Sequence, residues 1–231
     1  MRVHTVIRGT DPLSAPVALL FLHGVGSSSA TWTTVMDRLA DAYPVASFDL
    51  LGHGESPTPE DPELFTRDAA LGDIDDLLTE LGTPTVLVGH SLGGYLALAH
   101  AATRPDVASG LVVLNTGPGF RDDAKREAWN ERSRRNAHRF GVAPQAAEIN
   151  LQHDGVVMDR LTEITVPTLV LAGTADRPEY AGAGEYLAHK MPNCRFVAVD
   201  GGEHAMHESS HADEIAQLIA RFVTEQVLPA F

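Results

Sequence analysis

Three residue types that together perform nucleophilic catalysis occur along the chain in the order serine, aspartate, histidine. Ser91 lies in the sequence Gly-His-Ser-Leu-Gly, and Asp176 and His204 each follow a short apolar run. A serine hydroxyl is a weak nucleophile, so it needs a base to take its proton and a further group to orient that base. Asp176 and His204 are of the right types to supply these two functions. Their order therefore suggests a nucleophilic site built from three distant segments.

The Gly-His-Ser-Leu-Gly sequence has the context that such a nucleophile requires. The apolar run Thr85–Val88 precedes it and predicts a strand, and Leu92–Thr103 follows it and predicts a helix. A serine between these elements occupies a sharp turn, and the flanking glycines permit the close backbone approach of that turn. The alternative is that Ser91 only caps the helix, which serine also does well.

The acid and the base each have competitors close by in the sequence. Asp200 and Glu203 are nearer to His204 along the chain than Asp176 is. His207 is the alternative base if His204 is not the catalytic histidine. Asp176 and His204 are preferred because each falls just after a predicted strand, as Ser91 does.

The elements that must position these residues alternate between apolar runs and stretches of helical period. Continuous apolar runs are typical of strands that are covered on both faces, and their alternation with helices predicts an α/β domain with a mostly parallel sheet. Arg2–Arg8 alternates in polarity and predicts an antiparallel edge strand. The carboxyl ends of parallel strands share one edge, where open α/β sheets hold their ligands. The predicted strands are Val17–Leu22, Val45–Phe48, Thr85–Val88, Leu111–Leu114, Thr168–Ala172 and Phe196–Val199, and the predicted helices are Phe65–Leu81, Leu92–Thr103, Glu179–His189 and Ala212–Val227.

One interval, residues 119–161, has no run typical of a strand. A loop of this length without structure is unusual, so we interpret it as a small helical lid inserted over one end of the sheet. At spacings of three and four, one side is formed by Trp129, Ser133, Ala137 and Phe140, and the opposite side carries Lys125, Arg126, Arg132, Arg135 and Arg139. Arg121–Arg139 has seven basic and four acidic residues, a net charge of +3 against −17 for the remainder. A solvated helix face is the simpler explanation. The functional hypothesis is that Arg132, Arg135 or Arg139 reaches the pocket mouth and favours a substrate with a carboxylate.

Composition excludes several other classes of protein. The 231 residues include 17 Lys and Arg against 31 Asp and Glu, a formal charge of −14, which repels phosphate backbones and argues against nucleic-acid binding. No apolar run approaches the roughly 20 residues that a membrane helix needs. The first residues lack the features of a signal peptide, and Cys194, the sole cysteine, excludes an intrachain disulfide. We expect a single cytoplasmic domain over residues 1–231, with no membrane partner; the oligomeric state is not predicted.

Taken together, these motifs resemble the α/β-hydrolase superfamily from His23 to the final helix. Besides the three positions above, His23-Gly24-Val25-Gly26 resembles the oxyanion loop of the family, and Gly52–Ser56 resembles its Gly-x-Gly-x-Ser segment. The resemblance implies an α/β-hydrolase fold with Ser91 as nucleophile, His204 as base and Asp176 as orienting acid. It also implies an oxyanion hole made by the backbone N–H groups of Val25 and Leu92. Candidate substrate-binding residues are Gly24, His90 and Trp129.

A metal site is the alternative use of the histidines near the carboxyl terminus. His204, His207 and His211 are spaced three and four apart, which on a helix is suitable for zinc. Because the resemblance assigns His204 to catalysis, we expect no metal and no cofactor, and we expect His207 and His211 at the surface.

The predicted function is hydrolysis of a carboxylic ester, lactone or thioester in a small-molecule acyl substrate. Enzymes that cleave carbon–carbon bonds and cofactor-free perhydrolases (haloperoxidases) use the same triad, so they remain alternatives, as do hydroxynitrile lyases. A ligand-binding receptor that retains the hydrolase pocket is the alternative from another class of protein.

Overall fold

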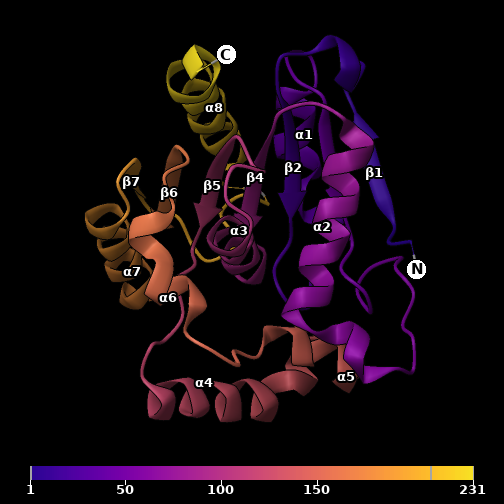
Figure 1. Cartoon of the computed structure of the whole chain (residues 1–231), viewed down its shortest axis with the longest axis vertical. Helices are drawn as coiled ribbons and strands as arrows, with labels where there is room; N and C mark the ends of the chain where they lie inside the picture. Colours follow the sequence, from indigo (N-terminus) through magenta and orange to yellow (C-terminus); the bar gives the residue numbers. More distant parts are fainter. Residues whose placement is uncertain (1, 209, 231) are drawn as a thin grey trace.

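A computed structural model of the chain describes residues 2–208 and 210–230 and has a central β-sheet (Figure 1). Within these residues the sheet contains seven strands in the order β1-β3-β2-β4-β5-β6-β7. β1 pairs antiparallel with β3, and the other neighbouring strands are parallel. The mostly parallel sheet with an antiparallel edge strand is therefore confirmed. The strands are β1 (Thr5–Arg8), β2 (Ala18–Leu22), β3 (Val45–Phe48), β4 (Thr85–His90), β5 (Gly110–Leu114), β6 (Thr168–Gly173) and β7 (Cys194–Val199).

Helices connect the parallel strands, as crossovers between such strands require. The predicted Phe65–Leu81 helix is in fact a short 3₁₀ turn followed by α2, because the Thr66 side chain accepts a hydrogen bond from Ala69 N at 3.2 Å and caps the helix there. The predicted Ala212–Val227 helix is α8 followed by one π-helical turn, Val223–Val227. The helices are α1 (Thr33–Leu39), α2 (Arg67–Leu81), α3 (Leu92–Thr103), α4 (Asp123–Asn136), α5 (Pro144–Ala147), α6 (Val156–Arg160), α7 (Pro178–Lys190) and α8 (Ala212–Phe222).

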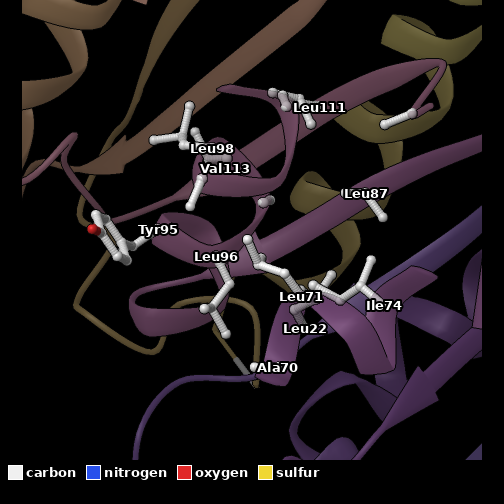
Figure 2. Packing of buried hydrophobic residues seen from close by; sticks show 14 of the residues in the cluster. Leu22, Ala70, Leu71, Ile74, Leu87, Tyr95, Leu96, Leu98, Leu111 and Val113 are labelled. Atoms are coloured by element: carbon white, nitrogen blue, oxygen red, sulfur yellow. The ribbon is translucent and has the colours of Figure 1, made fainter. Parts of the chain in front are cut away.

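The core lies on both faces of the sheet. Successive residues of β2 point to opposite faces, so Leu20 and Leu22 pack with α2 and α3, whereas Leu19 and Phe21 pack with α1 and α8. Figure 2 shows the first of these layers, with Leu22 of the sheet beside Leu71 of α2. Burial on both faces explains the continuous apolar runs of the central strands. It does not hold for β7, which lies at the sheet edge and is half-exposed along most of its length.

The segment between β5 and β6 contains α4, α5 and α6, and α4 lies beyond one end of the sheet, at the bottom of Figure 1. The buried face of α4 is held by polar contacts. The Asn130 side chain donates to Gln152 O at 2.8 Å and accepts from Gln152 N at 2.9 Å, and Asn150 Nδ2 donates to Ser133 Oγ at 2.8 Å. α6 packs against α3 instead. None of the described helices is long and apolar enough to cross a membrane.

Candidate active site

Ser91 occupies a strained turn between β4 and α3. Its φ of 51° and ψ of −114° are unusual for a residue other than glycine. A Cβ at Gly89 would overlap the carbonyl group of Gly93, and a Cβ at Gly93 would overlap that of Leu22. Glycine at both positions is therefore what allows α3 to pack directly onto the sheet end.

The backbone of Ser91 is fixed by hydrogen bonds on both sides of the residue. Its N–H donates to the carbonyl of Leu114 at 2.9 Å. Its own carbonyl accepts from Tyr95 N at 3.0 Å and from the Thr116 hydroxyl at 2.8 Å. These bonds hold the backbone in its strained conformation. The side chain of Ser91 lines a cavity of about 500 Å³ beyond the carboxyl ends of the strands.

The structure pairs Asp176 with His204. Asp176 follows β6, and its Oδ2 accepts a hydrogen bond from His204 Nδ1 at 2.6 Å. Its Oδ1 accepts from Arg177 N at 2.7 Å. The Asp176 side chain is 6% exposed and that of His204 is 40% exposed. This hydrogen bond assigns the proton to Nδ1 and leaves Nε2 of His204 free to accept one.

Ser91, Asp176 and His204 all line this cavity, although they are far apart in the sequence. Within the described residues, Ser91 Oγ and His204 Nε2 are not joined by a hydrogen bond. Such bonds are often long before substrate binds, so the geometry is compatible with a nucleophile and its base. The competing acid Asp200 accepts instead from the Thr174 hydroxyl at 3.3 Å.

His204 is further positioned through its backbone. Its carbonyl accepts from His90 Nε2 at 2.8 Å and from Asn115 Nδ2 at 2.7 Å. Asn115 Nδ2 also lies 3.1 Å from the carbonyl of Glu203, and Asn115 Oδ1 accepts from Gly173 N at 2.9 Å. Asn115 therefore joins the end of β6, which leads to Asp176, to the loop of His204.

The prediction that His207 lies at the surface is wrong, and His207 is also poorly placed to act as the alternative base. It is fully buried beneath the site, with its ring 4.1 Å from that of Trp32 and its Nε2 3.1 Å from the Thr31 hydroxyl. Burial, with a smaller contribution from His204, lowers the pKa of His207 to about 3. Burial also lowers the pKa of His90 well below its usual value. Both imidazoles are therefore neutral at pH 7 and add no charge beside His204.

The proposed oxyanion residues come from two different segments. Leu92 follows it at the start of α3, and Val25 lies in the loop after β2. This loop approaches closely, because a Cβ on Gly24 would lie 3.3 Å from Ser91 Cβ and 3.1 Å from His90 Nδ1. Among the described residues, neither the Val25 nor the Leu92 amide donates a hydrogen bond. Both N–H groups are thus available for an oxygen atom near Ser91.

The three candidate substrate-binding residues, Gly24, His90 and Trp129, line the same cavity. Sequence reasoning missed Arg177 and Tyr180, which line it from the other side. The ring of Tyr180 lies 4.9 Å from that of His204. Tyr180 follows Asp176 by four residues at the start of α7, but nothing in one sequence marks it as a contact of the histidine.

No grouping of three histidine, cysteine or acidic side chains suited to a metal ion is found in residues 2–208 and 210–230. His204 and His211 separate because His204 Nδ1 faces Asp176, whereas His211 Nε2 lies 2.9 Å from the carbonyl of Asp200. The spacing of three and four residues is not helical here, since α8 begins only at Ala212.

Residues 19–218 match the Alpha/beta hydrolase family, and the chain belongs to this family of enzymes. The pimeloyl-[acyl-carrier protein] methyl ester esterase of Xanthomonas campestris pv. campestris is 28% identical, with 92% of this chain and 97% of that protein covered. A Bacillus subtilis protein named as a putative 2-succinyl-6-hydroxy-2,4-cyclohexadiene-1-carboxylate synthase is 23% identical, with 84% and 86% covered. The solved structure of MenH from S. aureus matches with a TM-score of 0.83 and 24% identity, over 96% of this chain and 98% of that one.

Proposed function

We propose that the chain is a serine hydrolase that cleaves a carboxylic ester, lactone or thioester of a small molecule. The observation that supports this most directly is the Asp176–His204 hydrogen bond at a cavity that Ser91 enters from a strained turn. A methyl ester esterase among the relatives favours the same bond type. The relative named as a synthase shows that the family also includes other reactions, so the bond type needs a direct test.

In the proposed reaction, Ser91 Oγ attacks the carbonyl carbon of the substrate while Nε2 of His204 takes the hydroxyl proton. Asp176 stabilises the imidazolium that forms, and the N–H groups of Val25 and Leu92 hold the oxyanion. The carbonyl re-forms as the bond to the leaving group breaks, and Nε2 returns the proton to that group. Water then attacks the acyl-enzyme, gives up a proton to His204, and releases the acid and free Ser91.

Covalent labelling by a fluorophosphonate probe tests the nucleophile. We expect one equivalent of probe on Ser91 in peptide mass spectrometry, and we expect Ser91→Ala to lose both labelling and turnover of an ester and thioester panel. Ser27 lines the same cavity without occupying the turn, so Ser27→Ala is the matched control and should still be labelled at Ser91.

Two results would contradict the proposal. Labelling that persists in Ser91→Ala would assign the nucleophile to another residue. A folded wild-type protein that neither reacts with the probe nor turns over any member of the panel would favour a binding protein that retains the hydrolase pocket.

A further inference from the structure

Three arginines from two separate segments line the candidate active-site cavity. Arg132 is on α4, Arg139 is in the 3₁₀ turn that follows α4, and Arg177 comes directly after Asp176. All three line the cavity of about 500 Å³ that Ser91 and His204 share, and all three are exposed. Arg132 and Arg177 also line an adjoining cavity of about 370 Å³, which again includes Ser91.

In the part of the chain that the structure describes, Arg132, Arg139 and Arg177 lack the carboxylate partners that most other arginines have. Within the described residues, no carboxylate oxygen lies within 4.0 Å of the guanidinium group of Arg132, Arg139 or Arg177. Most other arginines have such a partner, at residues 2, 8, 38, 67, 104, 121, 126, 134 and 160. Arg135, Arg195 and Arg221 have no such partner among the described residues either, so what sets Arg132, Arg139 and Arg177 apart is that they line the cavity of Ser91.

The acids of the same cavity are already engaged. Both oxygens of Asp176 accept hydrogen bonds, from His204 and from the backbone of Arg177. Glu208, the other carboxylate of the larger cavity, accepts a hydrogen bond from the Thr31 hydroxyl. The arginines therefore keep donors that can bind an incoming anion.

Two aromatic side chains line the cavity beside these arginines, and one of them contacts Arg132. The guanidinium carbon of Arg132 lies 5.1 Å from the centre of the Trp129 ring, a cation–π contact that orients it at the cavity wall. Arg132 and Arg177 line both cavities together with Tyr180, whose ring packs on that of His204.

We propose that Arg132, Arg139 and Arg177 bind a carboxylate of the substrate remote from the carbonyl that Ser91 attacks. The inference rests on the proposed acyl chemistry and narrows it to substrates such as monoesters and thioesters of dicarboxylic acids. Guanidinium groups match a carboxylate because they donate two parallel hydrogen bonds in its plane. Arg177 replaces Arg135 in the sequence-based hypothesis, since Arg135 is exposed and does not line the cavity.

Matched esters test this binding site. The anionic set is monoethyl succinate, glutarate and adipate, and the neutral set is ethyl butanoate, pentanoate and hexanoate, which replace the free carboxylate by a methyl group. We expect at least one anionic ester to exceed its neutral partner in kcat/KM by roughly tenfold, since charged hydrogen bonds of this kind are worth that much. The ratio should fall at high salt, because exposed charges are screened over about 8 Å at physiological ionic strength.

Arg132→Gln should bring the ratio of the two kcat/KM values close to one, and Arg139→Gln gives a second test if the first variant does not fold. Arg135→Gln removes a charge from the same helix outside the cavity and should keep the wild-type ratio. Equal kcat/KM values for every pair in the wild-type protein, or the same loss in Arg135→Gln, would overturn the proposal.

A failure of the proposed function is distinguishable from a failure of this inference. If the wild-type protein hydrolyses neither set, binding of glutarate is measured by calorimetry in wild type and Arg132→Gln. Binding that is lost in Arg132→Gln and kept in Arg135→Gln supports the carboxylate site without the hydrolase. Absence of binding in the wild-type protein overturns the carboxylate site, whereas the hydrolase is judged separately by fluorophosphonate labelling of Ser91.

Discussion

Three hydrogen bonds hold His204 in place, and only one of them is made with a carboxylate. Its carbonyl accepts from His90 and Asn115, and its ring bonds to Asp176. The backbone contacts fix where the imidazole lies, whereas Asp176 fixes which nitrogen has the proton. A substitution at Asp176 therefore changes the contact that selects the protonated nitrogen of His204, while the backbone contacts that position the ring remain.

We expect Asp176→Asn to lower kcat by roughly 10³–10⁴-fold with little change in thermal stability, because an amide cannot stabilise protonated His204 and favours the wrong tautomer. Asp200→Asn is the matched control, since Asp200 contacts Thr174 rather than His204. Steady-state kinetics and thermal unfolding of both variants provide the measurement. A larger loss of kcat in Asp200→Asn would show that the acid is misassigned.

Candidate site positions could be proposed from one sequence where a local motif surrounds the residue. Ser91 has a strand, two glycines and a helix around it, and Asp176 and His204 follow strands in the matching order. No local sequence motif of this kind surrounds Asn115 or Tyr180. Their positions depend on contacts between segments about 24 to 89 residues apart, such as Asn115 with His204 and Tyr180 with the same ring. Only the folded structure shows these contacts.

At the scale of elements, Asn115 at the end of β5 connects two neighbouring loops. It has a φ of 46°, which asparagine tolerates, and it is fully buried. Its side chain bonds to Gly173 N and to the carbonyls of Glu203 and His204. The loops of Asp176 and His204 are thereby held together at the carboxyl edge of the sheet.

We expect Asn115→Gly to lower kcat and the rate of fluorophosphonate labelling by at least tenfold, because glycine keeps the positive φ but removes all three contacts. The free energy of unfolding should fall by about 1–3 kcal/mol, as for buried hydrogen bonds lost elsewhere. Asn193→Gly is the control, since Asn193 Nδ2 donates only to Thr165 O on an exposed turn. Labelling at the wild-type rate in a folded Asn115→Gly protein would exclude the positioning role.

The close packing of α3 on the sheet can be tested with two glycine substitutions, one at a packed position and one at an open position. A Cβ at Gly93 would overlap the carbonyls of Leu22 and His23, whereas a Cβ at Gly72 in α2 meets nothing within 4 Å. We expect Gly93→Ala to lose about 1–3 kcal/mol of unfolding free energy or more through overpacking. Gly72→Ala should gain about 0.5–1 kcal/mol because alanine is the better helix former. Urea unfolding measures both, and equal midpoints would mean that the sheet end relaxes around the added methyl group.

Helices and strands could be predicted from the sequence wherever their buried side chains form a recognisable apolar pattern. The central strands and α3 have the predicted extents within two residues, because their side chains are buried on both sides. α1 was missed: Thr33–Leu39 is seven residues long and has no side-chain cap, so its pattern is too short to recognise. α4 was predicted as a helix, but its attachment through Asn130 and Ser133 was not, since paired polar side chains leave no apolar periodicity.

At the scale of the whole molecule, burial of several imidazoles makes stability depend on pH. Burial lowers the pKa of His23 to about 4 and that of His207 to about 3, from an unfolded value of 6.5. Below pH 6.5 the unfolded chain therefore binds protons that the folded chain does not bind until about pH 4 and 3. The free energy of unfolding must fall as the pH drops through this window. Asp73 opposes this trend, because burial raises its pKa to about 6.

We expect the unfolding free energy to be at least about 2–3 kcal/mol lower at pH 5 than at pH 8, since His23 and His207 each remove about 2 kcal/mol and Asp73 returns about 1 kcal/mol. Burial also lowers the pKa values of His53, His90 and His100, so these imidazoles add to the difference. Urea unfolding at the two pH values measures the difference. His207→Phe keeps an aromatic ring against Trp32 but cannot titrate, so its difference between pH 8 and pH 5 should shrink by about 2 kcal/mol. His189 is exposed near the end of α7, and His189→Gln should keep the wild-type difference. A His207→Phe protein with the full wild-type pH dependence would mean that this imidazole binds its proton equally well in the folded and unfolded chain.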